Sequence, residues 1–252
     1  SKSFLPTLFD HMDILSRHTF MILTKRSEDM KRWIDFTLEH CVDKPMSNLW
    51  LGVTVCNQAE ADEKIPVLLE TPAAKRFVSI EPMLGPVDLT SIDYPDGLIE
   101  DADESGMLDA LRGLTMDDAP THPALDWVIC GGETGPNARP MHPDWVRSLR
   151  DQCQAAGVPF FFKGWGEWGA TGTRLDTGLP SFAMFESFTR YCNKAPTWMH
   201  KGDKLVRPDG HVPTHGAEEG KSYPMYIVRR LGKKRSGRLL DGREWNEFPE
   251  AR

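Results

Sequence analysis

The sequence predicts an α/β fold of parallel strands: a partial (β/α) barrel of the TIM type whose N-terminal βα units are missing from the chain. Three observations support this. Short apolar runs alternate with amphipathic helical stretches, which is the order of βαβ units in a barrel or in a doubly wound sheet. The apolar runs are continuous, as in strands that are covered on both faces. Five such runs are clear, whereas eight strands close an ordinary barrel.

Length and composition favour one α/β domain that spans residues 1–252. Forty per cent of the residues are hydrophobic, which is enough to bury one sizeable core. The net charge of −7 gives the chain no overall attraction for nucleic acid or for an anionic membrane. No stretch approaches about eighteen uncharged apolar residues, so we expect no membrane span.

Cysteine usage favours a reducing compartment. The five cysteines are odd in number and widely separated, and no CxxC pair is present. The sequence therefore encodes neither a disulfide framework nor a structural zinc site. The first residues also lack the basic-then-apolar order of a secretory signal. We therefore expect a cytoplasmic protein.

The first part of the chain alternates helices with strands. Apolar residues recur at helical spacing over residues 5–15, and residues 18–26 form a buried strand. Ser27 is the expected N-cap of a second helix over residues 27–41. Residues 49–57 form the next strand.

The same alternation continues to the middle of the chain. Residues 58–70 are predicted to be a helix and residues 76–82 a strand. A further strand covers residues 126–133. A helix over residues 143–156 begins with a proline and ends before a glycine, and residues 159–165 are the last clear strand.

Three segments break this rhythm. Residues 90–125 hold nine acids and one arginine, which predicts an acidic surface insertion with a short helix near 106–113. Residues 164–223 are rich in Gly, Trp, Pro and His and are predicted to be a long loop or lid. Residues 224–252 form a basic C-terminal tail, in which residues 224–230 are a candidate sixth strand.

Polar side chains follow every predicted strand. Because the carboxyl ends of parallel strands meet at one edge of a sheet, we expect these side chains to converge on one rim. Active sites of parallel α/β proteins lie at such rims. The residues predicted to form the site are Lys25, Arg26, Asn57, Glu81, Gly131, Gly132, Glu133 and Lys163.

Glu81, Glu133 and Lys163 are the candidate catalytic residues. Glu81 ends an apolar run and precedes a proline, which suits either a salt-bridged core acid or a site acid. Lys163 follows three phenylalanines. Its amine can bind an anion or pair with one of the two glutamates.

Lys25, Arg26, Asn57, Gly131 and Gly132 are predicted to bind the cofactor or another ligand. The two cations would hold a carboxylate or a phosphate, although the same pair also suits a solvated turn. The two glycines permit a close approach of the backbone.

We predict no metal site in this chain. Four histidines fit no tetrahedral ligand spacing, so they are interpreted as solvated loop residues. They are His142, His200, His211 and His215.

Several blocks of the sequence resemble one known family. These blocks are HTFMILTKRSEDM, NLWLGVTVCNQAEADEKIPVLLETPAAKRFVSIEPMLGPVDL, DWVICGGETGPNARPMHPDWVRSLRDQCQAAGVPFFFKGWGEW and GRLLDGREWNEFP. Together they are similar to a phage- and prophage-encoded family of unknown function, whose members look like partial relatives of radical S-adenosylmethionine enzymes. The resemblance covers nearly the whole chain and implies a barrel of the radical-SAM type.

The resemblance also implies cofactors for full-length members. These usually begin with three closely spaced cysteines, which would hold a [4Fe–4S] cluster and S-adenosylmethionine. That segment is absent here, so we expect no cofactor in the chain as given and no radical chemistry from it alone. A second protein that supplies the missing segment is a candidate partner, and the bacterial host cytoplasm is the expected location.

Two other functions stay open at this point. The first is a nucleic-acid-associated binding module, because the basic residues 229–243 lie near Trp245 and Phe248. The alternative is that these cations pair with the acidic insertion or with helix acids. The second is a cluster-free hydrolase or lyase that uses Glu81 and Glu133 as a carboxylate pair.

Overall fold

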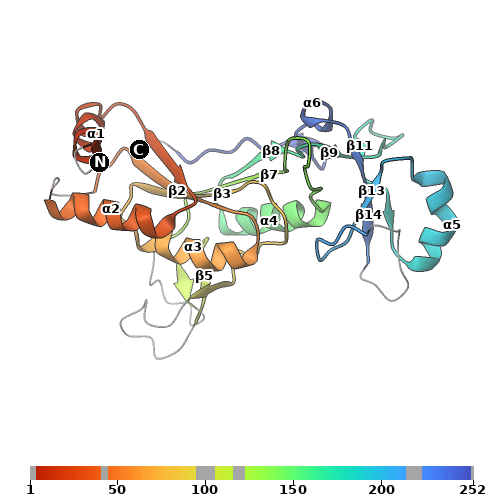
Figure 1. Ribbon diagram of the computed structural model, residues 1–252, viewed down its shortest axis with the longest axis horizontal. Helices are drawn as coiled ribbons and strands as arrows, with labels where there is room; N and C mark the ends of the chain where they lie inside the picture. Colours follow the sequence, from red (N-terminus) through yellow and green to blue (C-terminus); the bar gives the residue numbers. More distant parts are fainter. Residues whose placement is uncertain (1–3, 41–44, 95–105, 116–122, 214–222, 251–252) are drawn as a thin grey trace.

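A five-stranded parallel sheet forms the body of the computed structural model, which describes residues 4–40, 45–94, 106–115, 123–213 and 223–250. Its strands are β1 (Phe20–Thr24), β2 (Leu49–Val55), β3 (Lys75–Ile80), β7 (Trp127–Gly131) and β8 (Phe160–Gly164). They lie side by side in chain order (Figure 1). The predicted α/β fold of parallel strands is confirmed, while closure into a TIM-type barrel stays a prediction.

Four helices accompany these strands, and three of them cover one face of the sheet. They are α1 (Phe4–Ile14), α2 (Ser27–His40), α3 (Gln58–Glu70) and α4 (Pro143–Ala156). Helices α2, α3 and α4 lie on the same side of the sheet (Figure 1). Within the described residues, no helix has the length and apolar character needed to cross a bilayer.

Side chains and one glycine satisfy the free backbone groups at the ends of these helices. Asn57 accepts a hydrogen bond from an amide in the first turn of α3. His142 does the same for α4, so this buried residue is a cap and not the solvated loop residue that we predicted. Gly157 ends α4 with a φ of 70°.

The main hydrophobic core lies between the sheet and these helices. Every second residue of each strand faces it, as Leu51 and Val53 of β2 do. Ile34, Leu68 and Leu149 meet them from α2, α3 and α4. This packing fixes the positions of the strand ends, where the candidate site residues lie.

The opposite face of the sheet, called the open face below, carries none of α2, α3 and α4. Met21 lies beside Trp50, and Gly52 lies beside Phe77. A Cβ atom at Gly52 would lie 2.4 Å from the Phe77 ring, so the glycine makes room for that ring. Met21 and Leu23 are half-exposed. The buried aromatic residues of this face are Trp50, Phe77 and Trp127, with Phe161 beside them.

The described part of the acidic insertion forms a small antiparallel sheet of β4 (Ile92–Tyr94), β5 (Gly106–Asp109) and β6 (Leu114–Thr115). The helix predicted near 106–113 is therefore wrong. The apolar residues that suggested a helix belong to β5 and to the turn after it. Residues 95–105 and 116–122, which hold most of the acids, lie outside the described residues.

Residues 164–223, predicted to be a long loop or lid, contain regular elements instead. Three of their strands join the strand over residues 225–230 in a four-stranded antiparallel sheet that packs against one helix, and two further strands pair with each other. The prediction missed these elements because the strands within 164–223 have only two or three residues and the helix fully buries none of its own. The elements are β9 (Trp168–Gly169), β10 (Gly172–Thr173), β11 (Pro180–Ser181), β12 (Met184–Phe185), α5 (Phe188–Trp198) and β13 (Lys204–Val206). The fourth strand of the sheet, β14 (Met225–Arg230), comes after residue 223.

The predicted basic C-terminal tail contains short strands and one helix, and its described residues 224–250 are called the strap below. Strand β14, the candidate sixth strand, pairs antiparallel with β12 and β13 and does not join the parallel sheet. After it come α6 (Lys233–Ser236), β15 (Leu239–Leu240) and β16 (Arg243–Glu244).

The last described segment then runs along β8. The Phe162 amide donates to the Trp245 carbonyl over 2.9 Å, and the Glu247 amide donates to the Phe160 carbonyl over 3.2 Å. The chain thereby covers the exposed edge of the sheet, and it brings α6 to the carboxyl end of β8.

Candidate functional site

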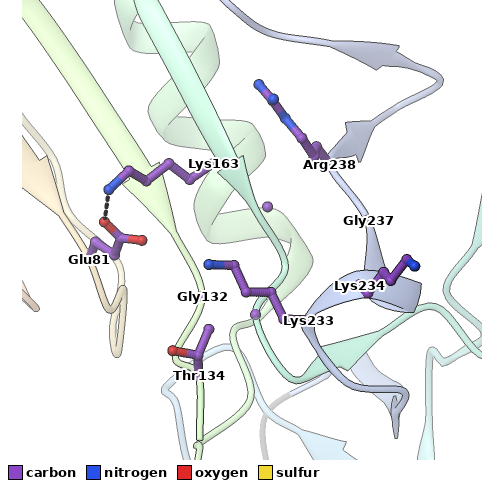
Figure 2. A pocket seen from close by; sticks show the side chains of 10 residues that line it. Glu81, Gly132, Thr134, Lys163, Lys233, Lys234, Gly237 and Arg238 are labelled. Carbon is purple, nitrogen blue, oxygen red and sulfur yellow. Dashed lines mark hydrogen bonds and ion pairs between the residues drawn. The ribbon is translucent and has the colours of Figure 1, made fainter.

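A pocket of about 530 Å³ lies at the carboxyl ends of β3, β7 and β8 (Figure 2). Glu81 and Lys163 continue the open face of β3 and β8 into it, because every second residue of a strand faces the same side. Helix α6 and the residues after it form its other wall. The lining residues are Glu81, Gly132, Thr134, Lys163, Gly164, Gly166, Lys233, Lys234, Gly237 and Arg238.

Glu81 and Lys163 form an ion pair across the end of β7. The Lys163 Nζ atom donates to Glu81 Oε2 over 2.6 Å (Figure 2). Gly131 lies between them: a Cβ atom there would lie 3.1 Å from Glu81 Oε1 and 3.3 Å from the Lys163 Cβ. The glycine therefore leaves room for the pair. The side chains of Glu81 and Lys163 are 31% and 49% exposed, so both can reach a ligand.

Two glycine-containing loops pack backbone to backbone beneath this pair. The Gly132 amide donates to the Gly164 carbonyl over 2.9 Å. A Cβ atom at Gly132 would lie 2.2 Å from the Trp165 carbonyl oxygen, and one at Gly166 would lie 2.2 Å from the Glu133 carbonyl oxygen. Gly166 also has a φ of 73°, which only glycine adopts readily. We predicted that Gly131 and Gly132 allow a close approach of the backbone. At Gly132 the group that approaches is the backbone of Trp165, which belongs to the protein itself.

Three cations of the strap complete the lining. Lys233 and Lys234 belong to α6, and Arg238 follows it. The Lys233 side chain extends toward the Glu81–Lys163 pair, whereas Lys234 and Arg238 point toward the edge of the pocket (Figure 2). Among the described residues, no carboxylate forms an ion pair with these three cations. Sequence reasoning assigned them to the tail, because no linear pattern shows that the chain returns to the sheet.

Glu133 does not line this pocket and is held by Arg139. The guanidinium donates to it from Nε over 2.9 Å and from Nη2 over 2.7 Å, and the Arg139 backbone amide donates over 2.6 Å. These hydrogen bonds lower the pKa of the Glu133 carboxyl, so it stays ionised. Sequence reasoning missed Arg139, whose only signal was its place six residues later in the same loop.

The other predicted residues lie at the ends of β1 and β2, and they do not line the pocket. The Asn57 Oδ1 atom accepts the α3 capping hydrogen bond over 3.0 Å. Arg26 is exposed and lies 3.8 Å from Asp29 of α2. Lys25 is exposed as well. The structure therefore brings Glu81, Lys163 and the glycine pair together and leaves these three residues apart from them.

The described cysteines do not gather at one place. Cys130 and Cys153 are buried in the main core, and burial raises the pKa of both thiols. Cys192 is exposed on α5, and Cys56 follows β2. Cys41 lies outside the described residues. Within the described part of the chain, no three His, Cys, Asp or Glu side chains form a group that could hold a metal ion.

One family model matches almost the whole chain. The model described as "Protein of unknown function (DUF5131)" matches residues 1–249. No curated protein and no solved structure matches the chain. The matched range includes the parallel sheet and the strap, and hence every residue that lines the pocket.

Proposed function

We propose that this chain, which belongs to the DUF5131 family of proteins of unknown function, binds a small anionic molecule in the pocket at the carboxyl ends of β3, β7 and β8. The anionic group is a phosphate or a carboxylate. Ligands of parallel α/β proteins bind at this end of the strands. The volume of about 530 Å³ suits a small molecule.

The observation that carries this proposal is an excess of cations. Of the ten lining residues, four are Lys or Arg and one is Glu. The chain as a whole has a net charge of −7, so this local excess runs against its composition. Lys163 of β8 and Lys233 of α6 both extend their amines toward Glu81 (Figure 2). A bound anion would compensate their charges and accept their hydrogen bonds.

Glu81 gives the pocket a second chemical property. Its Oε2 atom accepts from Lys163, and its Oε1 atom lies beside Gly131, where no Cβ blocks it. A ligand that carries a hydroxyl or amino group next to its anionic group would donate to Glu81 while Lys233 holds the anion. This arrangement supports an enzyme site in which Glu81 and Lys163 contact the substrate.

The proposed scaffold is part of a (β/α) barrel. The strands follow one another in chain order, and α2, α3 and α4 cover a single face. A doubly wound sheet instead reverses its strand order and places helices on both faces. The strand order and the placement of the helices on one face therefore support a barrel and not a doubly wound sheet.

The relation to radical S-adenosylmethionine enzymes and the phage origin stay proposals based on the sequence blocks. The described residues do not fit a [4Fe–4S] cluster, since the four described cysteines lie apart. We assign no step to such a cluster. The carboxylate of S-adenosylmethionine is one anion that the cations of this pocket would accept.

The paired-carboxylate hydrolase has less support than anion binding. The two carboxylates that it requires have different partners. Lys163 pairs with Glu81 at the pocket, whereas Arg139 pairs with Glu133, which does not line the pocket. A nucleic-acid-binding role has one supporting observation, because three consecutive exposed cations form most of α6. Arg229, Arg230 and Arg243 of this region pair with nearby carboxylates, as Arg229 does with Asp203 over 2.7 Å.

Calorimetric titration of the full chain with inorganic phosphate tests anion binding. We expect Lys233→Ala to weaken binding about tenfold, because it removes one charge-assisted hydrogen bond. Lys194→Ala is the matched control, since Lys194 is an exposed lysine of α5 that does not line the pocket. Equal affinities of the wild-type chain and Lys233→Ala would contradict the proposal.

A further inference from the structure

We infer that the ligand of this pocket is a nucleotide, whose phosphate group enters the pocket and whose base stacks on Phe248. The inference rests on the proposed anion site and adds the chemical class of the molecule that fills it. It comes from the aromatic side chains that continue the open face beyond Lys163.

An exposed aromatic ring lies on this face over Phe161, a neighbour of the pocket residue Lys163 on β8. Phe161 precedes Lys163 by two residues in β8, so both side chains project from the same side of the strand. The Phe248 ring packs on Phe161, with centroids 5.2 Å apart, and on Trp127 at 4.9 Å. Phe248 is 59% exposed, whereas Trp127 is buried beneath it. A ring held in this way is a fixed surface for stacking.

Arg238 joins the pocket to that ring. It lines the pocket, and its guanidinium lies over the Phe161 ring, 5.3 Å from the centroid. It also donates a hydrogen bond to the Asn246 Oδ1 atom. Asn246 bridges to the backbone of Phe161 and lies two residues before Phe248. Arg238 thus lines the cationic pocket, lies over the Phe161 ring and contacts the segment that carries Phe248.

A nucleotide matches both halves of this surface. Lys163, Lys233 and Arg238 supply the charge that a phosphate group requires. The exposed face of Phe248 can stack on any base, because every base has a π face, and such stacking is worth about tenfold in affinity. A simple carboxylate or phosphate would use the cations and leave the ring without a role. Charge and stacking together therefore select the nucleotide over a smaller anion.

Titration of the full chain with adenosine 5′-monophosphate and with ribose 5-phosphate tests the inference, because both carry the same sugar phosphate and the second has a hydroxyl in place of the base. We expect the nucleotide to bind about tenfold more tightly. Phe248→Ala should reduce the ratio of the two affinities to about twofold or less and leave ribose 5-phosphate binding unchanged. Phe248→Trp should preserve the ratio. Leu175→Ala removes another exposed apolar side chain, one that does not line the pocket, and should change neither affinity.

The outcomes separate this inference from the function on which it rests. Equal affinities for the two ligands, or a ratio that Phe248→Ala leaves unchanged, would overturn the nucleotide assignment while anion binding stands. Failure of both ligands to bind, or binding that is insensitive to Lys233→Ala, would overturn the anion site itself.

Discussion

Two glutamate–cation pairs follow neighbouring strands of the sheet, and their surroundings differ. Glu133, after β7, accepts three hydrogen bonds from Arg139 and lies outside the pocket lining. Glu81, after β3, accepts one hydrogen bond from Lys163 and lines the pocket. In the sequence the two carboxylates look alike, since each follows an apolar run. A carboxylate at a strand end can act on a ligand only where its partner leaves part of it free.

The backbone around each pair explains this difference. Glu133 lies in a loop that is packed against Gly166, and its carbonyl accepts from the Glu167 amide over 2.9 Å. The Glu81–Lys163 pair instead borders Gly131, whose missing side chain leaves space. One pair therefore fixes a loop, and the other remains accessible from the pocket.

The largest expected effect is a loss of stability when a side chain is added at Gly166, where the Glu133 loop packs. An alanine Cβ there would overlap the Glu133 carbonyl oxygen at 2.2 Å, in addition to the unfavourable φ of 73°. We expect Gly166→Ala to lower the free energy of unfolding by about 3 kcal/mol or more, as measured by urea denaturation. Gly178→Ala is the matched control, because its φ is 69° and nothing lies within 4 Å of the added Cβ. It should cost about 1 kcal/mol, and equal losses would show that steric contact with Glu133 is unimportant.

A smaller effect should distinguish the two carboxylates by ligand binding. Glu81→Gln removes the charge that competes with a bound anion for Lys163, so we expect phosphate affinity to rise about fivefold. Glu133→Gln should leave it unchanged, because Glu133 does not line the pocket. Calorimetric titration with inorganic phosphate measures both variants. Similar changes in the two would mean that the pairs contribute to one site.

The sheet could be predicted because its strands carry strong local signals. Continuous apolar runs such as residues 49–55 and 160–162 have few alternatives to a buried strand. The region built on β14 could not be predicted in the same way. Its partner strands β12 and β13 have two and three residues, which is too short for a hydrophobic period.

The site was predictable only as far as the parallel strands determine it. Because the carboxyl ends of parallel strands converge, we could predict that Glu81 and Lys163 lie close together, although they are 82 residues apart in the chain. Lys233 and Arg238 flank the backbone contact that holds this part of the chain at the end of β8, where the Trp165 amide donates to the Gly237 carbonyl over 3.2 Å. A tertiary contact between backbones leaves no pattern in the sequence around the cations, so they were interpreted as part of a basic tail.

The smallest expected effect tests how firmly Arg139 fixes Glu133. Arg139→Ala removes the two guanidinium hydrogen bonds but keeps the one from the residue's backbone amide. Because the Arg139 side chain is 60% exposed, we expect a loss of only about 0.5–1 kcal/mol in unfolding free energy at neutral pH. Arg174→Ala is the matched control: Arg174 is similarly exposed and makes one contact, to Asp176 over 3.3 Å. It should have almost no effect.

The pH dependence of that loss provides the sharper test. The pKa of Glu133 in the folded chain is lowered from its ordinary 4.5, so the stabilisation is present above 4.5 and disappears as the pH falls through the folded value. The difference between the wild-type chain and Arg139→Ala should therefore vanish in acid, as measured by urea denaturation across that range. A difference that persists where Glu133 is protonated would show that Arg139 acts through packing. The difference between Glu133 and Glu81 would then be caused by the packing around them and not by their ion pairs.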